Sequence, residues 1–434
     1  MSPTGPRRKG WCPGALRPME TGDGLLARVR LSSGRLTLLQ AAVIAHAALA
    51  CGNGAIGLSG RANLQLRGVR EETLPDLHAR LDAAGLIDPD PEIERLRNIL
   101  ASPLSDVDPS AALDCADSVA ALEKRLAEDL SLRPLPAKFA FVVDAGGRLP
   151  LGDVDADIRI EAERVPGGAV FAAFLGGEDG FAALCPPAGL AEAAARLARS
   201  FLGLVGSGDD APRRMRALVA RAGAKAVFDA AGLEAAARRR ASARVSPRHI
   251  LGGHVFGSAI VVGLAAAFGE IEARRFKALV ERAHELGATG LRLTPWRAFF
   301  ILGLDPRSAA SVVATAAKLG FITHADEPRL RVAACPGAPA CIHGLRAVRD
   351  DAARFAAHLP EGAGIALHVS GCAKGCARPS PTAATLVATE DGYDLVLNGK
   401  AGDAPVRRGL SNAVAAALFA AGGDQMFAEA RAQA

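Results

Sequence analysis

The sequence predicts a mixed fold that combines the α+β and α/β classes and is built from two repeated halves. Three observations predict it. The chain has 434 residues, too many for one ordinary domain. Its two halves match each other without a gap over a long stretch. Within each half, short apolar segments alternate with segments whose apolar residues recur at helical spacing.

The repeat has an offset of 235 residues. The matched positions include one four-residue segment and two glycines. They are Leu58–Arg61 with Leu293–Trp296, Gly68 with Gly303, and Gly85 with Gly320. Alanine and glycine are abundant enough to match by chance, but an ungapped register over this length favours a duplication.

Each copy is predicted to contain a strand, a helix, a second strand and a second helix. These are Leu25–Leu31, Leu38–Ala50, Ala55–Arg67 and Leu74–Ala84 in the first copy, and His254–Ala267, Arg274–Leu286, Gly290–Leu302 and Ala309–Leu319 in the second. Gly85 and Gly320 follow the second helices, where glycine commonly ends a helix. A β-α-β unit of this kind is half of a ferredoxin-like sandwich. We therefore expect two half-ferredoxin-like units.

A larger α/β segment follows each unit. Its predicted elements are strands Phe139–Asp144, Ile158–Glu163 and Ala169–Leu175 with helix Leu190–Leu204 in the first half, and helix Arg346–His358 with strands Ile365–Ser370, Thr385–Thr389 and Tyr393–Leu397 in the second. The expected domains are 10–72 (first half-ferredoxin-like unit), 73–210 (first α/β domain), 211–305 (linker helices and second unit) and 306–434 (second α/β domain).

Composition argues against several functions. No apolar run reaches the roughly 20 residues of a membrane span. The longest candidate, Val255–Phe268, is shorter and rich in glycine and alanine. The net charge of +5 is too small to indicate a nucleic-acid partner. The N-terminal residues are polar and basic with no apolar segment behind them, so we expect a cytoplasmic protein.

Four cysteines near the C-terminus form the most specific motif. Five residues separate Cys335 from Cys341, and three separate Cys372 from Cys376. Glycine and proline surround both pairs, which lets the backbone approach a bulky inorganic group. A [4Fe-4S] cluster takes one cysteine thiolate for each iron. The sequence therefore predicts that these four residues hold one such cluster.

Isolated thiols, disulfides and structural zinc fit the cysteines less well than a cluster does. Buried apolar thiols suit Cys51, Cys115 and Cys185, which stand alone, but they do not explain two close pairs. Disulfides form in oxidising compartments, and the sequence carries no secretory signal. Structural zinc favours spacers of two to four residues, whereas the first spacer here has five.

Electrons for the cluster are expected to come from another protein. The run Gly52–Gly57 fits G-x-G-x-x-G, but it follows a predicted helix and precedes a predicted strand, the reverse of a dinucleotide-binding turn. No other nicotinamide or flavin motif occurs in the sequence. We therefore expect an external electron-donor protein or an NAD(P)H-dependent reductase as a partner.

The repeat and the cysteine pairs together resemble a known family. The half-ferredoxin-like units, the Cys-x5-Cys and Cys-x3-Cys pairs and the run Ser370–Pro379 are similar to the sulfite and nitrite reductase superfamily, over nearly the whole chain. The resemblance implies a [4Fe-4S] cluster on the four cysteines and a tetrapyrrole cleft between the two halves. In sirohaem-containing members it also implies a bridge from Cys376 to the haem iron.

The resemblance also implies three cationic residues in the active site. Arg61 and Arg97 match two arginines of the superfamily, and Lys138 matches the first of two lysines. Cations beside a tetrapyrrole bind an oxyanion or the carboxylate arms of the ring itself. The alternative for each is a solvated surface charge. The second lysine position is Ala140, which weakens a sulfite-reducing assignment.

One branch of the superfamily is more similar than the reductases. The segments Gly10–Gly14, Pro18–Leu25, Arg61–Gly68 and Leu291–Arg297 resemble the branch that acts on precorrins in aerobic cobalamin synthesis. In that branch the tetrapyrrole is the substrate. The resemblance implies that O2 hydroxylates carbon 20 of precorrin-3A and that the ring A acetate closes a γ-lactone. An arginine-lined cleft suits a substrate with many acetate and propionate arms.

Chemistry with O2 also requires an activating metal or cofactor. The resemblance leaves two candidates, a mononuclear iron and a sirohaem. Non-haem iron usually takes two histidines and one carboxylate. His324 and Asp326 have suitable spacing, and His343 and His368 are close in sequence to the cluster cysteines. The alternative role for each histidine is a structural hydrogen bond.

Two further functions remain compatible with the sequence. A sirohaem-dependent sulfite or nitrite reductase would use Cys376 as the haem bridge and the three cations to bind its anion. An iron–sulfur electron-transfer subunit would use the cluster alone. Sirohaem would give intense visible bands, whereas a cluster alone gives a broad brown absorbance.

Overall fold

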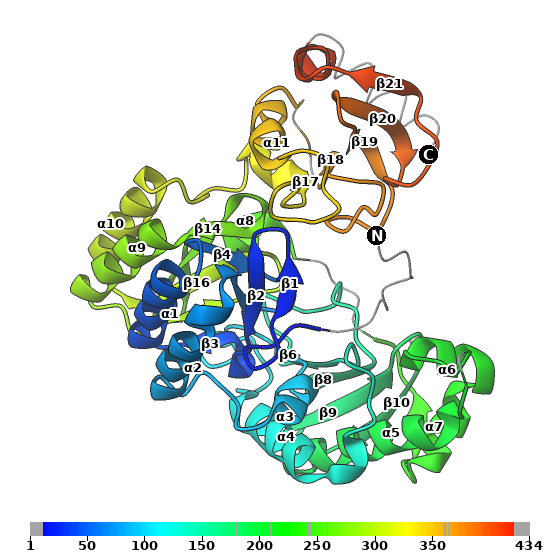
Figure 1. Cartoon of the computed structure of the whole chain (residues 1–434). Coiled ribbons are helices and arrows are strands. Elements are labelled where there is room, and N and C mark those ends of the chain that lie inside the picture. The colour runs from blue at the N-terminus through cyan, green and yellow to red at the C-terminus, as the bar shows by residue number, and fades with distance from the viewer. Residues whose placement is uncertain are drawn as a thin grey trace.

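The computed structural model describes residues 12–420, apart from 179, 209, 241–244, 258, 360–361 and 363. Within these residues the strands form four sheets, two of which belong to the internal repeat (Figure 1). Gly10 and Trp11 of the N-terminal motif, and residues 421–434 of the last expected domain, lie outside the described residues. The architecture is the mixed α/β arrangement of repeated halves that the sequence predicts.

The two repeat sheets share one layout. The first repeat sheet runs, in spatial order, through β1 (Met19–Thr21), β2 (Gly24–Val29), β5 (Leu64–Val69), β4 (Ala55–Leu58) and β14 (Glu270–Glu272). The second repeat sheet runs through β12 (Gly252–Phe256), β13 (Ala259–Ala265), β16 (Ala298–Leu304), β15 (Gly290–Leu293) and β3 (Arg35–Leu36). Each sheet ends on a strand from the other half, because β14 pairs with β4 and β3 pairs with β15. The halves are therefore joined by a reciprocal exchange of strands.

Strand register confirms the predicted duplication. Arg28 pairs with Gln65 in the first repeat sheet, and Gly263 pairs with Phe300, 235 residues later on both strands. Residues with positive φ repeat at the same offset. They are Ser33 with Phe268, Gly34 with Gly269, Ala62 with Arg297, and Gly68 with Gly303. Positive φ is uncommon outside glycine, so shared positions of this kind indicate one backbone design used twice.

Three predicted strands are instead hairpins of two antiparallel strands. They are Ala55–Arg67, Gly290–Leu302 and His254–Ala267. In the first, the Ser59 side chain accepts a hydrogen bond from the Asn63 N–H, and Ala62 turns the chain at a φ of 51°. Apolar alternation continues on both sides of this turn, which is why the sequence favoured one long strand. The hairpin places Arg61 at its tip.

The long apolar run Val255–Phe268 lies largely in the β12–β13 hairpin, just after the short helix α8 (Pro247–Ile250). No helix of the described residues is both long and apolar enough to cross a membrane. The longest of them, α5 (Leu190–Val205), has 16 residues.

Helices cover one face of the two repeat sheets. They are α1 (Leu38–Cys51), α2 (Leu74–Ala83), α9 (Ala273–Glu285) and α10 (Pro306–Lys318). Helices α1 and α9 pack against each other, and their apolar residues share one core with both sheets. The Thr37 side chain begins α1 by accepting from the Gln40 N–H, while the Gln40 side chain accepts from the Thr37 N–H. These four helices do not cover the opposite faces of the two sheets, which therefore face other parts of the chain.

The middle sheet belongs to the first α/β segment. Its strands, in spatial order, are β11 (Ala235–Ala237), β10 (Phe181–Cys185), β9 (Gly168–Leu175), β8 (Ile158–Val165), β7 (Phe141–Asp144) and β6 (Ile99–Ala101). The accompanying helices are α3 (Pro91–Leu96), α4 (Ala116–Glu128), α5, α6 (Met215–Ala222) and α7 (Ala224–Ala230). Their apolar faces and the sheet form a second core.

The C-terminal sheet carries the cysteine motif on its loops. Its strands are β17 (Val332–Ala334), β18 (Leu367–Ser370), β19 (Thr382–Ala388), β20 (Tyr393–Gly399) and β21 (Arg407–Leu410), with helix α11 (Arg349–Ala356) packed beside them. Cys335 directly follows β17, and Cys372 closely follows β18. These strands are parallel neighbours, so both cysteine loops leave the same edge of the sheet. Figure 1 shows this domain in yellow to red, beside the repeat sheets.

Candidate functional site

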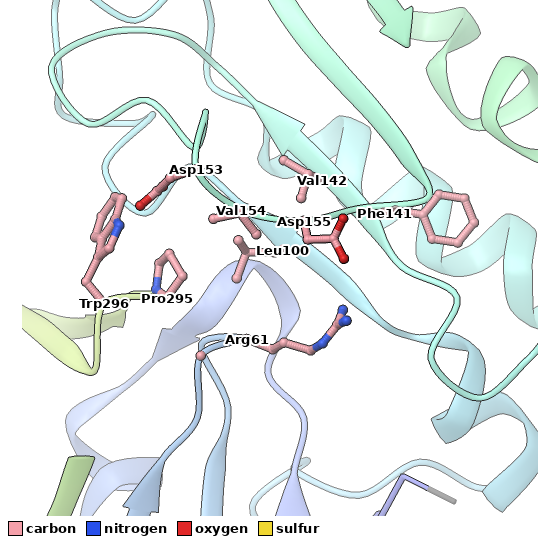
Figure 2. A pocket seen from close by; sticks show the side chains of 10 residues that line it. Arg61, Leu100, Phe141, Val142, Asp153, Val154, Asp155, Pro295 and Trp296 are labelled. Atoms are coloured by element: carbon pink, nitrogen blue, oxygen red, sulfur yellow. The ribbon is translucent and has the colours of Figure 1, made fainter. Parts of the chain in front are cut away.

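A cavity of 260 Å³ lies where the two repeats meet the first α/β segment. Gly60 and Arg61 line it from the first repeat, and Pro295 and Trp296, the matching loop positions, line it from the second. Strands β6 and β7 and the loop Asp153–Asp155 complete its wall (Figure 2). The cavity therefore lies between the corresponding hairpin tips of the duplicated units.

Arg61 is the predicted cation that lines this cavity. Its side chain extends beneath the loop that holds Asp155 (Figure 2). Arg61 Nη1 donates to Asn98 Oδ1 at 3.2 Å, and Asn98 Nδ2 donates to the Phe139 carbonyl oxygen at 2.9 Å. Burial lowers the pKa of Arg61. A buried asparagine thus fixes the guanidinium that faces the cavity.

Asn98 also joins the three stretches in which the predicted cations occur. It follows Arg97 in the chain, bonds to Arg61, and reaches the residue after Lys138. No role was predicted for Asn98 from the sequence. The sequence signal for Asn98 was its place between the apolar residues Leu96 and Ile99. A polar residue in an apolar stretch is frequently buried and hydrogen-bonded.

Arg97 is bound by carboxylates and does not line the cavity. Its Nη2 lies 2.8 Å from Asp88 Oδ2, and its Nη1 lies 3.4 Å from Glu123 Oε1. Arg97 Nη2 also donates to the Arg30 carbonyl oxygen at 3.3 Å. The side chain therefore ties the end of β2 to α4 and to the segment between α2 and α3.

The two superfamily lysine positions differ in burial. Lys138 is exposed, whereas Ala140 is buried and its N–H donates to Asp157 Oδ2 at 2.9 Å. Arg214 Nε lies 2.9 Å from Asp157 Oδ1. The structure thus brings Arg61 to the cavity, holds Arg97 in ion pairs and leaves Lys138 at the surface.

The two cysteine loops interlock. Leu345 N donates to the Gly371 carbonyl oxygen at 2.9 Å, and Gly371 N donates to Cys335 Sγ at 3.1 Å. A Cβ on Gly344 would come within 2.5 Å of Ala338 N, a separation that real Cβ atoms do not show. Ala338 and Gly344 both belong to the loop that carries Cys335 and Cys341, so glycine is required where this loop folds back on itself.

The four thiols of these loops influence one another. Burial raises the pKa of Cys335, and Cys341 and Cys372 raise it further. Burial, followed by Cys372 and Cys341, likewise raises the pKa of Cys376. Within the described residues every cysteine is free of disulfides. A cationic metal group would reverse these pKa shifts by stabilising the thiolates, so this donor set fits an iron–sulfur cluster.

The histidines considered as ligands of a mononuclear iron do not gather around one point. In the described part of the chain, no group of three or more histidine, cysteine or acidic side chains could hold a metal ion. His324, Asp326 and His343 are exposed, and Asp326 lies 3.4 Å from Arg248. His368 is fully buried, with neither ring nitrogen bonded to a described residue. A cubane cluster binds its cysteines through separate irons, so its ligands stand farther apart than those of one ion.

A buried ion pair ties one cysteine loop to the first repeat sheet. Arg67 on β5 donates to both carboxylate oxygens of Asp23, at 2.9 and 3.1 Å, and to the Ala340 carbonyl oxygen at 2.6 Å. A Cβ on Gly22 would overlap the Pro339 carbonyl oxygen. The turn between β1 and β2 therefore packs directly on the loop that holds Cys341.

Comparison with known proteins identifies the family. Residues 17–84 match the nitrite/sulfite reductase ferredoxin-like half domain. A precorrin-3B synthase from Sinorhizobium sp is 36% identical over 424 residues, which cover 95% of this chain and 87% of the relative. The chain belongs to the precorrin-3B synthase family. The resemblance in the sequence is confirmed, and this precorrin-3B synthase family member is an oxidoreductase.

The reductase branch is more distant from this precorrin-3B synthase family member. A ferredoxin–nitrite reductase from Synechococcus elongatus is 24% identical over 419 residues, covering 89% of this chain and 82% of the relative. The structure of the Mycobacterium tuberculosis NirA protein has a TM-score of 0.71 at 18% identity, covering 88% of this chain and 77% of that one. This likeness establishes the shared fold. The superfamily as a whole points to sirohaem and iron–sulfur cofactors, and the interlocked cysteine loops fit the latter.

Proposed function

We propose that the protein catalyses the O2-dependent hydroxylation of carbon 20 of precorrin-3A, with γ-lactone formation, in aerobic cobalamin biosynthesis. The observation that carries the proposal is one continuous arrangement on the first repeat sheet. The β4–β5 hairpin presents Arg61 to the cavity, and Arg67 on the same β5 strand bonds to the cysteine loop. The anionic substrate ring and the cluster that supplies its electrons would therefore both lie beside the first repeat sheet. The relationship to the Sinorhizobium precorrin-3B synthase supports the same reaction.

The proposed reaction balances as a monooxygenation. One atom of O2 adds across the ring double bond at carbon 20, and the other atom leaves as water after accepting two electrons and two protons. An external electron-donor protein or an NAD(P)H-dependent reductase provides the electrons. The ring A acetate oxygen then attacks the other carbon of the former double bond, where the C–O bond breaks and leaves a hydroxyl group on carbon 20. The lactone thus closes without a further oxidant.

Arg61 is the residue proposed to bind the substrate at the cavity. Its guanidinium suits a carboxylate arm, and Asn98 holds it in the required direction. At 260 Å³ the cavity accommodates an arm or an edge of the ring, but not a whole tetrapyrrole. Arg97 holds the end of β2 in place and is itself held by its ion pairs. Lys138 lies at the surface, so it would contact only a carboxylate arm of the substrate that extends out of the cavity.

Cys335, Cys341, Cys372 and Cys376 are proposed to hold the [4Fe-4S] cluster. When bound, such a cluster supplies electrons singly, and an additional iron, mononuclear or in sirohaem, would activate O2. Asp23 and Arg67 keep the Cys341 loop against the sheet that binds the substrate.

A sirohaem-dependent sulfite or nitrite reductase is the second candidate. The similarity to ferredoxin–nitrite reductase favours it. The buried Ala140 argues against it, because one of the two lysine positions then has no cation.

Anaerobically reconstituted protein should convert precorrin-3A, in the presence of reductant and O2, into a product that carries one atom from labelled O2 by mass spectrometry. Cys335→Ser should lose the cluster absorbance and the activity. Cys185→Ser, which alters a thiol on β10, should retain both. A wild-type protein that carries sirohaem bands, reduces nitrite or sulfite rapidly and leaves precorrin-3A unchanged would instead be a reductase.

A further inference from the structure

His368 is buried beneath the loop that holds Cys372 and Cys376. It lies on β18, the strand that leads into this loop, and it is 0% exposed. Its neighbours on both sides join the core beside α11, so His368, at the alternate position, faces the other side of the sheet. A Cβ on Gly375, which directly precedes Cys376, would come within 3.6 Å of His368 Cε1. The imidazole therefore lies directly under the Cys372–Cys376 loop.

The ring of His368 lacks the partners that a buried histidine normally has. Neither Nδ1 nor Nε2 has a hydrogen-bond partner among the described residues. Burial, and then the nearby Arg378, lower the pKa of His368 to about 4, so the ring is neutral at neutral pH. A neutral imidazole has one N–H that donates and one nitrogen that accepts. Burying both without partners is destabilising, so the position points to a group that supplies them.

Arg378 carries a second unsatisfied donor close to the same loop. Its Nε is buried and has no partner in the part of the chain that the structure describes. The backbone N–H of Arg378 donates to the Gly375 carbonyl oxygen at 3.1 Å. At the start of the loop, Ser370 Oγ donates to the Cys372 carbonyl oxygen at 2.7 Å. Hydrogen bonds within the protein thus hold both ends of the loop, whereas the buried nitrogens of His368 and Arg378 beside it lack described partners.

The first α/β segment identifies the residue equivalent to His368. Strands β6 to β10 and strands β17 to β21 follow the same spatial order, with two parallel pairs and then two antiparallel pairs. In this alignment β7 corresponds to β18. Phe141 and Leu367 begin these strands, pair with the first residues of β6 and β17, and belong to the helix-covered cores. Val142 and His368 follow them, so they occupy equivalent positions.

Val142 shows that this position of the fold does not require a histidine. Its apolar side chain is 1% exposed and packs in the core of the repeats. The loop that follows β7 contains no cysteine, whereas the loop that follows β18 contains two. The duplicated fold thus has valine where no cysteine follows and histidine where the cysteines follow. This difference favours a role for His368 toward the cluster.

We propose that His368 is a positioning residue of the cluster site and that its ring N–H donates a hydrogen bond to a thiolate sulfur of the Cys372–Cys376 loop. The inference rests on the proposed function, which assigns a [4Fe-4S] cluster to these cysteines. Arg378 Nε donates to the other ring nitrogen and so fixes the tautomer. A hydrogen bond to a ligand sulfur stabilises the reduced cluster, because reduction adds negative charge there. His368 therefore raises the reduction potential of the cluster.

The reduction potential of the reconstituted cluster, followed by electron paramagnetic resonance during an anaerobic redox titration, tests the proposal. His368→Leu should keep the iron content and absorbance of the cluster. It should bind the added electron about three- to tenfold less tightly, a fall of roughly 30–60 mV at about 59 mV per tenfold. His368→Gln, which retains an N–H donor, should recover part of the potential. His358→Leu, an exposed change in the same domain, should match the wild type. An unchanged potential in His368→Leu would overturn the proposal.

Stability before reconstitution separates this role from a structural one. Leucine leaves no unpartnered ring nitrogen beneath the loop, so His368→Leu should raise the Tm of the cluster-free protein. A His368→Leu protein that fails to fold, or that melts earlier than the wild type before reconstitution, would make His368 structural and overturn the proposal. Loss of the cluster from both His368→Leu and His368→Gln would also overturn it, since a hydrogen bond that adjusts the potential is not needed for assembly.

Conversion of precorrin-3A distinguishes this inference from the proposed function. If the wild type forms the hydroxylated lactone and His368→Leu leaves the potential unchanged, the role of His368 is wrong and the function stands. If His368→Leu lowers the potential but the wild type does not oxidise precorrin-3A, His368 adjusts the cluster of an enzyme with another reaction. A wild-type protein that holds no iron–sulfur cluster after reconstitution would overturn both.

Discussion

At the scale of single residues, the site depends on how each guanidinium is partnered. Arg97 has two carboxylates, Arg61 has one amide oxygen, and Arg30 has Nε and Nη1 without a described partner. A cation that already has carboxylate partners gains little from an anionic ligand, whereas one without them gains most. Partnering therefore ranks Arg30 and Arg61 above Arg97 as candidates for binding an anion.

Arg61→Ala provides the residue-scale prediction. The variant should lower precorrin-3A turnover or affinity by about ten- to hundredfold, because one charge-assisted contact disappears from the cavity. The visible absorbance of the reconstituted cluster should stay the same, since the cysteine loops are on another domain. Kinetics and spectra on the same preparation check both parts. Unchanged turnover and affinity would remove Arg61 from the site.

The sequence predicted Arg61 because it stands in a motif, but nothing in the sequence pattern selected Arg30. An alternation such as Arg28-Val29-Arg30 normally indicates a strand with one solvent-exposed face. Only the three-dimensional arrangement reveals that the polar face is buried. The apolar residues Gly263 and Ala265, at the matching positions of the repeat, were the one available hint.

At the scale of elements, the β1–β2 turn couples the first repeat sheet to a cysteine loop. Asp23 accepts from Arg67, and Arg67 reaches the Ala340 carbonyl oxygen. Burial alone would raise the pKa of Asp23, but hydrogen bonds from Arg67 and Thr21 lower it below its ordinary value of 3.8. The lowered pKa means that the ionised carboxylate stabilises the folded protein.

Asp23→Asn should weaken this coupling in a pH-dependent way. At pH 7 the variant should lose about 1–3 kcal/mol of unfolding free energy, because it leaves the buried Arg67 without its charged partner. The ion pair stabilises the wild type above pH 3.8 and is lost as pH falls through the lower folded pKa, so the difference should shrink there.

Urea unfolding at several pH values checks the Asp23 prediction. Asp76→Asn is the matched control, because Asp76 also pairs with an arginine, 2.9 Å away, but at an exposed helix surface. It should cost little at any pH. An Asp23→Asn loss that stays constant down to acidic pH would contradict the ion pair as the cause.

Sequence periodicity located helices better than strands. Helix α1 begins at Leu38 as predicted, and α5 begins at Leu190. Two of the three hairpins were missed because their turns depend on positive φ angles at Ala62 and Arg297, and neither alanine nor arginine predicts such a turn. Strands β3 and β14 are too short to have a period, so the exchange between halves could not be predicted.

At the scale of the whole molecule, the duplicated units form an intramolecular counterpart of a swapped dimer. Each repeat sheet is completed by a strand from the other half, and α1 packs against α9 in a core common to both. The cavity lies between the matching loops. The shape of the cavity therefore depends on both halves being folded together. The two halves line it with different residues, Arg61 from the first and Trp296 from the second.

This exchange predicts that a core mutation in one half loosens the sheet of the other. Ile271 on β14 and Leu36 on β3 are equivalent residues and are both buried, so either change to alanine should cost about 2–5 kcal/mol. Ile271→Ala should lower hydrogen-exchange protection most in β4 of the first repeat sheet, and Leu36→Ala should do so in β15 of the second. Peptide-level exchange with mass spectrometry resolves the two regions. If each variant instead loosens only the sheet of its own half, the exchanged strands do not couple the halves, and the cavity between them would have to be held by the helices alone.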